Sequence, residues 1–149
     1  MSPDQIYSII NLAILPPWVL LAVLPHHRIT QWLVHAIWVP LILGPLYVWA
    51  LFFGPPPVDG AGFGDLQSLM KLFQSPVAVI AGWTHYLVFD LFIGAWIVRD
   101  AKREQINHWL TLPFLFATLM AGPAGLMGYL LLRTGVTRRM SLNETAVPA

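Results

Sequence analysis

The chain has 149 residues, of which 57% are hydrophobic and only 10% carry a charged side chain. Soluble domains are typically about 45–50% apolar and about 25% charged, so this composition excludes an ordinary soluble domain and a disordered chain. The formal net charge is only +1, which gives no basic surface for nucleic acid. The absence of cysteine excludes disulfide frameworks, thiolate metal sites and thiol nucleophiles. A small integral membrane protein remains.

Four segments are apolar and long enough to cross a bilayer as helices, namely residues 6–24, 32–53, 76–98 and 109–132. The sequence therefore predicts an all-α fold, an integral membrane four-helix bundle. We expect one transmembrane domain over residues 1–133 and a polar flexible tail over residues 134–149. An even number of spans places both termini on the same side of the membrane. With straight spans, four Lys and Arg fall on each side, so the positive-inside rule gives no orientation.

The connection between the second and third spans becomes amphipathic after a Gly-Pro-Pro-Pro start. Its apolar residues at helical spacing are Phe63, Leu66, Leu69, Met70 and Phe73. This pattern predicts a short helix lying in the membrane interface. Such a helix is either a lid over a pocket that opens from the bilayer or a plain surface linker.

Prolines lie near the middle of three spans, at Pro16-Pro17, Pro45 and Pro123, and Asp90 lies near the middle of the other. A proline inside a helix kinks it and frees backbone carbonyls. These kinks and the acid would open a small polar cavity, unless the prolines are simply tolerated in membrane helices.

Small residues line one flank of the last span. They are Ala121, Gly122, Ala124, Gly125 and Gly128. Small residues let another helix approach closely. We expect this face to pack within the bundle or to join protomers in a homo-oligomer.

The third span carries the residues best suited to chemistry. Asp90 lies near its middle, where a charge costs about 2.5–3.5 kcal/mol on insertion scales and must be neutralised, paired or hydrated. At about 100° per residue, Trp83 and Tyr86 share its helix face. His85 points along a different flank, beside Phe89. We expect Asp90 and His85 to be an acid/base pair in an aromatic-walled pocket, with a purely structural role for Asp90 as the alternative.

Asn11, about half-way down the first span, is a further polar candidate that would contact substrate or make a helix–helix hydrogen bond. The five histidines show neither the paired spacing of a zinc helix nor the histidine boxes of a membrane di-iron centre. Phosphate-binding loops and dinucleotide fingerprints are absent as well. We therefore expect no metal and chemistry without a cofactor.

The stretch GWTHYLVFDLFIG at residues 82–94 resembles a signature of the abscisic-acid-deficient-four (neoxanthin synthase-like) membrane family. The stretches RDA at 99–101, GPAGL at 122–126 and LPPW at 15–18 are similar to that family too. The chain starts directly at its first helix with no plastid transit segment, which points to a bacterial-type member in a bacterial inner membrane.

The resemblance implies a role in carotenoid metabolism, since plant members are associated with converting violaxanthin into its allenic isomer neoxanthin. The residues that match the family are Trp83, His85, Tyr86, Asp90, Arg99 and Asp100. The resemblance implies an isomerase in which Asp90 protonates an epoxide oxygen and His85 takes a vinylic proton, or in which these two roles are exchanged.

In that interpretation Trp83, Tyr86 and Phe89 grip the end ring of a lipid-soluble polyene. The other expected substrate contacts are Asn11, Arg99 and Asp100. The expected partners are this substrate and membrane lipids, with no nucleic acid. The alternatives are another isoprenoid substrate, a double-bond isomerisation, a non-enzymatic carotenoid-binding or assembly protein, and a small proton-linked carrier.

Overall fold

The structure is a computed structural model that describes residues 1–54 and 58–143, and within this part the chain contains helices and no strand. The helices are α1 (Pro3–Val23), α2 (Arg28–Leu33), α3 (Trp38–Phe52), α4 (Leu66–Leu72), α5 (Pro76–Arg103) and α6 (His108–Thr137). Four segments are long and apolar enough to cross a membrane, and they are α1, the α2–α3 pair, α5 and α6. The predicted all-α fold with four membrane segments is confirmed.

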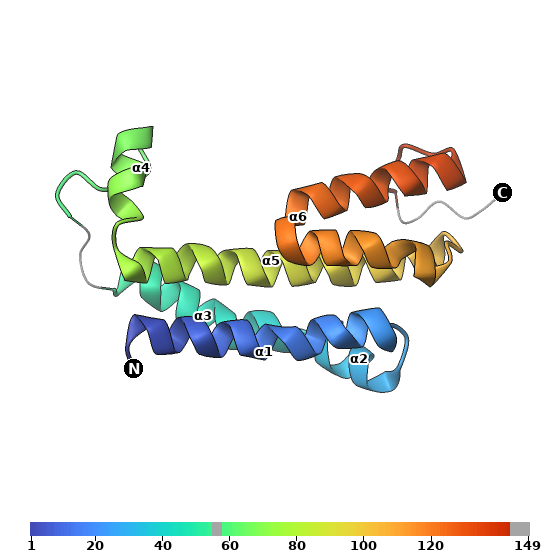
Figure 1. Cartoon of the computed structure of the whole chain (residues 1–149), viewed down its shortest axis with the longest axis horizontal. Coiled ribbons are helices and arrows are strands. Elements are labelled where there is room, and N and C mark those ends of the chain that lie inside the picture. The colour runs from blue at the N-terminus through green and yellow to red at the C-terminus, as the bar shows by residue number, and fades with distance from the viewer. Residues whose placement is uncertain (55–57, 144–149) are drawn as a thin grey trace.

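Three of these segments run side by side, with α1 and α3 both packed against α5 (Figure 1). The core between α1 and α5 includes Ile14, Leu21 and Leu91. Gly94 permits the closest approach, because a Cβ there would lie only 2.6 Å from the Trp18 ring. Many large apolar side chains point outward and stay exposed, as expected of surfaces that face lipid rather than water.

The second predicted span is divided into α2 and α3 by residues 34–37. Pro40 lies in the first turn of α3, where a missing backbone N–H removes no intrahelical bond. The N-terminal helix α1 begins with a capping box, in which Ser2 and Gln5 exchange side-chain and backbone hydrogen bonds.

The last segment, α6, reverses its direction instead of running straight (Figure 1). Ala121 has φ −157° and ψ 68°, which interrupts the helical path between residues 108–120 and 122–137. A Cβ on Gly128 would lie 2.7 Å from the Phe114 ring, and one on Gly125 would overlap the Thr118 backbone. Residues seven apart in a straight helix are about 10 Å apart along its axis. The two halves therefore pack against each other as a helical hairpin.

This reversal shows that the predicted straight helix at 109–132 is wrong, whereas the placement of both termini on one side of the membrane stays a prediction. The hairpin begins beside the end of α5 and returns there, because Arg133 near its far end contacts Asp100 and Glu104. The N-terminus lies at the opposite end of the molecule (Figure 1). Pro123 fits this turn, because it does not kink the middle of a helix but occupies the first turn of a new one.

The short helix predicted in the connection exists as α4 and lies across the direction of α5 (Figure 1). Asp65 caps it by accepting a hydrogen bond from the Ser68 backbone N–H at 2.8 Å. At the other end of the chain, α6 continues to Thr137, so the first residues of the predicted flexible tail are helical. Residues 55–57 and 144–149, which include the triple proline and the end of that tail, lie outside the described residues.

Candidate functional site

Asp90 lies near the middle of α5, directly against the turn of the α6 hairpin. Its side chain is buried, with 8% of the residue exposed. The carboxylate accepts hydrogen bonds from the Tyr86 hydroxyl and from the backbone N–H of Gly122. Gly122 begins the second half of α6, where unpaired N–H groups carry a partial positive charge. A Cβ on Gly122 would overlap the carboxylate, so only glycine permits this approach.

One oxygen of this carboxylate lacks a hydrogen-bond partner among the described residues. Asp90 Oδ2 is buried and accepts no hydrogen bond from the described residues. Buried polar atoms in folded proteins are rarely left unpaired, and an unpaired carboxylate oxygen is especially costly. This atom is therefore the position in the fold at which a bound polar group or a proton would be most strongly stabilised.

An aromatic wall leads to Asp90 along α5. The rings of Trp83 and Tyr86 are stacked, with centroids 5.2 Å apart and planes inclined by 17°. Tyr7 of α1 packs against Trp83 at 5.7 Å. The Trp83 Nε1–H donates to Asn11 Oδ1 at 2.9 Å, and Asn11 Nδ2 donates to the Tyr7 carbonyl. Asn11 thus makes the helix–helix bond that was its alternative role, and it fixes the orientation of the Trp83 indole.

His85 has different surroundings on another flank of α5, as the helical spacing predicts. Its ring is stacked on Phe89 at 4.4 Å and lies 5.8 Å from the Tyr47 ring of α3. The structure therefore does not bring His85 to the buried oxygen of Asp90. Phe89 accompanies His85 and is separate from the wall formed by Trp83 and Tyr86.

A cavity of about 630 Å³ lies beside His85, between α3, α4 and the first half of α5. Its wall is mostly apolar, and α4 with the residues on either side of it contributes Phe63, Leu72 and Phe73. Volumes of roughly 300–1,000 Å³ are typical of small-molecule sites. The amphipathic segment therefore covers a pocket rather than being a plain surface linker.

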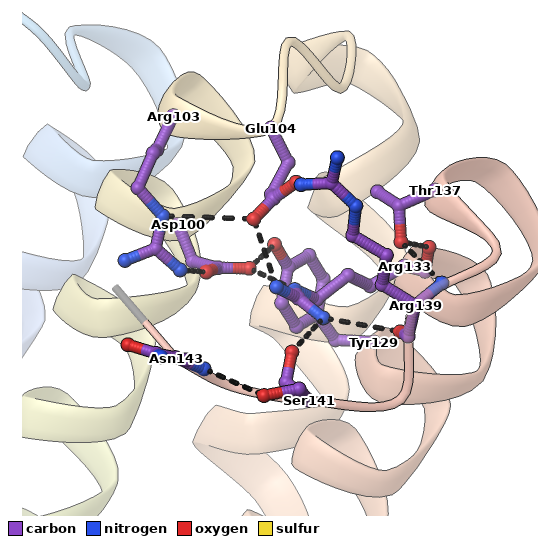
Figure 2. A network of polar contacts seen from close by, with 9 residues as sticks. All are labelled: Asp100, Arg103, Glu104, Tyr129, Arg133, Thr137, Arg139, Ser141 and Asn143. Atoms are coloured by element: carbon purple, nitrogen blue, oxygen red, sulfur yellow. Dashed lines mark hydrogen bonds and ion pairs between the residues drawn. The ribbon is translucent and has the colours of Figure 1, made fainter. Parts of the chain in front are cut away.

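Asp100 is engaged in a buried ion network at the end of α5 (Figure 2). It accepts hydrogen bonds from the Tyr129 hydroxyl at 2.6 Å and from Arg133 Nε at 2.8 Å, and it also pairs with Arg103. Arg133 is only 1% exposed and donates a further bond to Glu104 at 2.8 Å. Both carboxylate oxygens of Asp100 are thus paired. Its Oδ2 joins α5 to the second half of α6, and its Oδ1 bonds Arg103 of α5 itself.

Arg99, the remaining predicted contact, is exposed, and its guanidinium lies 2.9 Å from His35 Nδ1. Among the described residues, no group of three or more His, Asp or Glu side chains is arranged to hold a metal ion.

Sequence analysis missed four members of the network, which are Arg103, Glu104, Tyr129 and Arg133. Tyr129 and Arg133 are four residues apart on α6, and so are Asp100 and Glu104 on α5. Residues at this spacing lie one above the other on a helix face. The matching pairs are a signal in the sequence, but they meet only because α6 turns back at Gly122.

Comparison with known proteins identifies the family of this chain. A family model described as ABA DEFICIENT 4-like matches residues 5–129, which include Asp90, Tyr86 and the turn at Gly122. The protein ABA DEFICIENT 4, chloroplastic, of Arabidopsis thaliana is 27% identical over 135 residues, which cover 85% of this chain and 59% of that relative. No solved structure matches the chain. Because the family model spans most of the sequence, the chain belongs to the ABA DEFICIENT 4-like family.

Proposed function

We propose that the chain is a membrane-embedded isomerase that rearranges the end group of a carotenoid or related isoprenoid. The observation that carries this proposal is Asp90, a buried carboxylate in a membrane helix with one unpartnered oxygen. A purely structural acid would be expected to use both oxygens, as Asp100 does. Ionisable groups in membrane helices generally mark functional sites. Similarity to neoxanthin synthase-like proteins supplies the substrate class.

In this proposal Asp90 and Tyr86 form the acid/base pair. The Tyr86 hydroxyl gives its proton to the epoxide oxygen as the carbon–oxygen bond breaks. Asp90 takes the proton from the neighbouring vinylic carbon, and the electrons of that carbon–hydrogen bond form the new double bond of the allene. The hydrogen bond between the two side chains then returns the proton from Asp90 to Tyr86. Substrate and product are isomers, so no oxidant or reductant is consumed.

The surroundings of the pair fit this chemistry. The N-terminus of the second half of α6 faces the Asp90 carboxyl group, and the Gly122 N–H donates to it. Trp83, fixed by Asn11, offers a flat surface for the end ring of the polyene. His85, whose ring is stacked on Phe89, contacts a different part of the same long substrate in the cavity on the other flank of α5.

The test is expression in a bacterial host that makes an epoxy-xanthophyll, with pigments separated and weighed by mass spectrometry. The wild type should produce a new pigment of unchanged mass. Asp90→Asn should abolish it, and Tyr86→Phe should reduce it by roughly 10²-fold or more, the usual contribution of a positioned acid or base. Asp59→Asn is the matched control, because Asp59 is exposed in the loop before α4 and should leave the yield unchanged.

Two outcomes would overturn the proposal. A full yield from Asp90→Asn, with the protein present in the membrane at the wild-type level, would exclude Asp90 from the reaction. Pigment that copurifies unchanged with the wild type and with Asp90→Asn would instead identify a binding protein. His85→Phe tests whether Tyr86 or His85 takes part in proton transfer. If His85→Phe makes no product while Tyr86→Phe remains active, His85 is the base instead.

A further inference from the structure

The reversal of α6 gathers most of the cationic residues at one end of the molecule. The ends of α1, α5 and α6 meet there, because the His108 ring lies 2.9 Å from the Ala22 carbonyl and Arg133 is bonded to Asp100. The cations at this end are Arg28, Arg99, Lys102, Arg103, Arg133, Arg138 and Arg139. They are seven of the eight Lys and Arg in the chain, and the eighth, Lys71, lies on α4 at the opposite end (Figure 1).

The acidic residues do not cancel this asymmetry. Among the described residues, the cationic end carries two acids, Asp100 and Glu104. The opposite end carries three acids, which are Asp4, Asp59 and Asp65. Of the seven cations only Arg133 is buried, so six are exposed at the surface of this end.

An uneven distribution of cations between the two ends of a membrane protein favours one orientation in the bilayer. Loops with an excess of Lys and Arg remain on the cytoplasmic side of the membrane. Each Lys or Arg near a leaflet rich in anionic lipid contributes about 1 kcal/mol of attraction. Six exposed cations at one end, against one at the other, therefore favour a single orientation strongly.

We propose that the cationic end is the cytoplasmic face, seated on anionic lipid headgroups, and that α6 is a re-entrant hairpin that enters and leaves the bilayer on that face. The N-terminus and α4 then lie on the opposite side. A turn inside the bilayer is tolerated only where its backbone groups find partners within the protein. The Gly122 N–H meets this condition through its hydrogen bond to Asp90.

The orientation depends on the hairpin itself. A straight α6 would move Arg133, Arg138 and Arg139 to the end that holds Lys71, and the two ends would then carry equal numbers of cations. The proposal is independent of the isomerase activity, because it rests on topology and charge alone.

Single-cysteine labelling tests both parts of the proposal, and the chain has no cysteine of its own to interfere. Gly64→Cys and Gly135→Cys are a matched pair, since both positions are exposed and a Cβ at either has nothing within 4 Å. Gln31→Cys, exposed on α2, marks the cationic end whatever the course of α6. Each full-length variant is expressed in a bacterial inner membrane and treated with a membrane-impermeant maleimide, before and after permeabilisation of spheroplasts.

The expected result is labelling of Gly64→Cys in intact spheroplasts, with Gln31→Cys and Gly135→Cys labelled only after permeabilisation. Labelling of Gly135→Cys together with Gly64→Cys would show that α6 crosses the membrane and would overturn the hairpin. Labelling of Gln31→Cys and Gly135→Cys in intact spheroplasts, with Gly64→Cys protected, would keep the hairpin but overturn the orientation.

Discussion

Replacing Arg133 by methionine tests whether the buried ion network holds the α6 hairpin against α5. The guanidinium donates to Asp100 and Glu104, and through its NH1 to the carbonyls of Arg139 and Ser141 (Figure 2). Methionine fills a similar volume and is stable in an apolar site. The substitution therefore removes the charge and the hydrogen bonds without opening a large cavity.

Removing one partner of a buried ion pair typically costs about 3–5 kcal/mol, because the other partner is left as an uncompensated charge. Asp100 would keep its bonds to Tyr129 and Arg103, which places the expected loss at the lower end, about 3 kcal/mol. Arg133→Lys should lose less, because it keeps the charge but not the planar fork that reaches both carboxylates.

The assay is reversible unfolding in mixed detergent micelles, from which the free energy of unfolding is obtained. Arg139→Met is the matched control, since Arg139 is exposed and its loss should change this free energy by no more than about 0.5 kcal/mol. If the free energy of unfolding of Arg133→Met lies within that same margin of the wild-type value, the network does not hold the hairpin against α5.

Three further predictions follow from single contacts. Gly122→Ala should reduce activity and stability, because its Cβ overlaps the Asp90 carboxylate, whereas Gly135→Ala meets no atom within 4 Å and should be neutral in the same two measurements. Trp83→Phe loses the hydrogen bond to α1 and should lower the free energy of unfolding by about 0.5–1.5 kcal/mol. Hydrogen bonds from Ser68 lower the pKa of Asp65 below its ordinary 3.8. The cap of α4 is therefore fully formed above that value and is lost as the pH falls through the lowered pKa, which hydrogen exchange of the α4 amides would detect.

The helices could be predicted from the sequence, but the path of the last one could not. Hydropathy reports that residues 109–132 are apolar and long enough to span, and it carries no information on direction. Pro123 after Gly122 is equally compatible with a kink inside one helix and with the start of a second. The choice is decided by tertiary contacts, in which Gly125 fits against Thr118 and the Gly122 N–H meets Asp90.

The candidate site, too, could be predicted from the sequence only in part. Helical periodicity alone places Trp83 and Tyr86 on the face of Asp90 and sets His85 on another flank, and the structure confirms both placements. The buried partners of Asp100 could not be predicted from the sequence, because a straight α6 would carry Tyr129 and Arg133 away from α5. Contacts along one helix follow from spacing, whereas contacts between helices depend on the topology.

The turn of the hairpin and the acid at its side depend on each other, and this decides which substitution of Asp90 is informative. The start of a half-helix inside a membrane leaves N–H groups that need an acceptor, and a carboxylate inside a membrane needs donors. Asp90→Asn keeps an acceptor for the Gly122 N–H but can neither take nor give the proton of the reaction. We expect it to keep the cysteine-labelling pattern of the wild type and to lose activity. Asp90→Leu removes the acceptor as well, so it should disturb the position of the hairpin. If both variants disturb the labelling equally, Asp90 acts by its charge in holding the fold, and its role in proton transfer loses its main support.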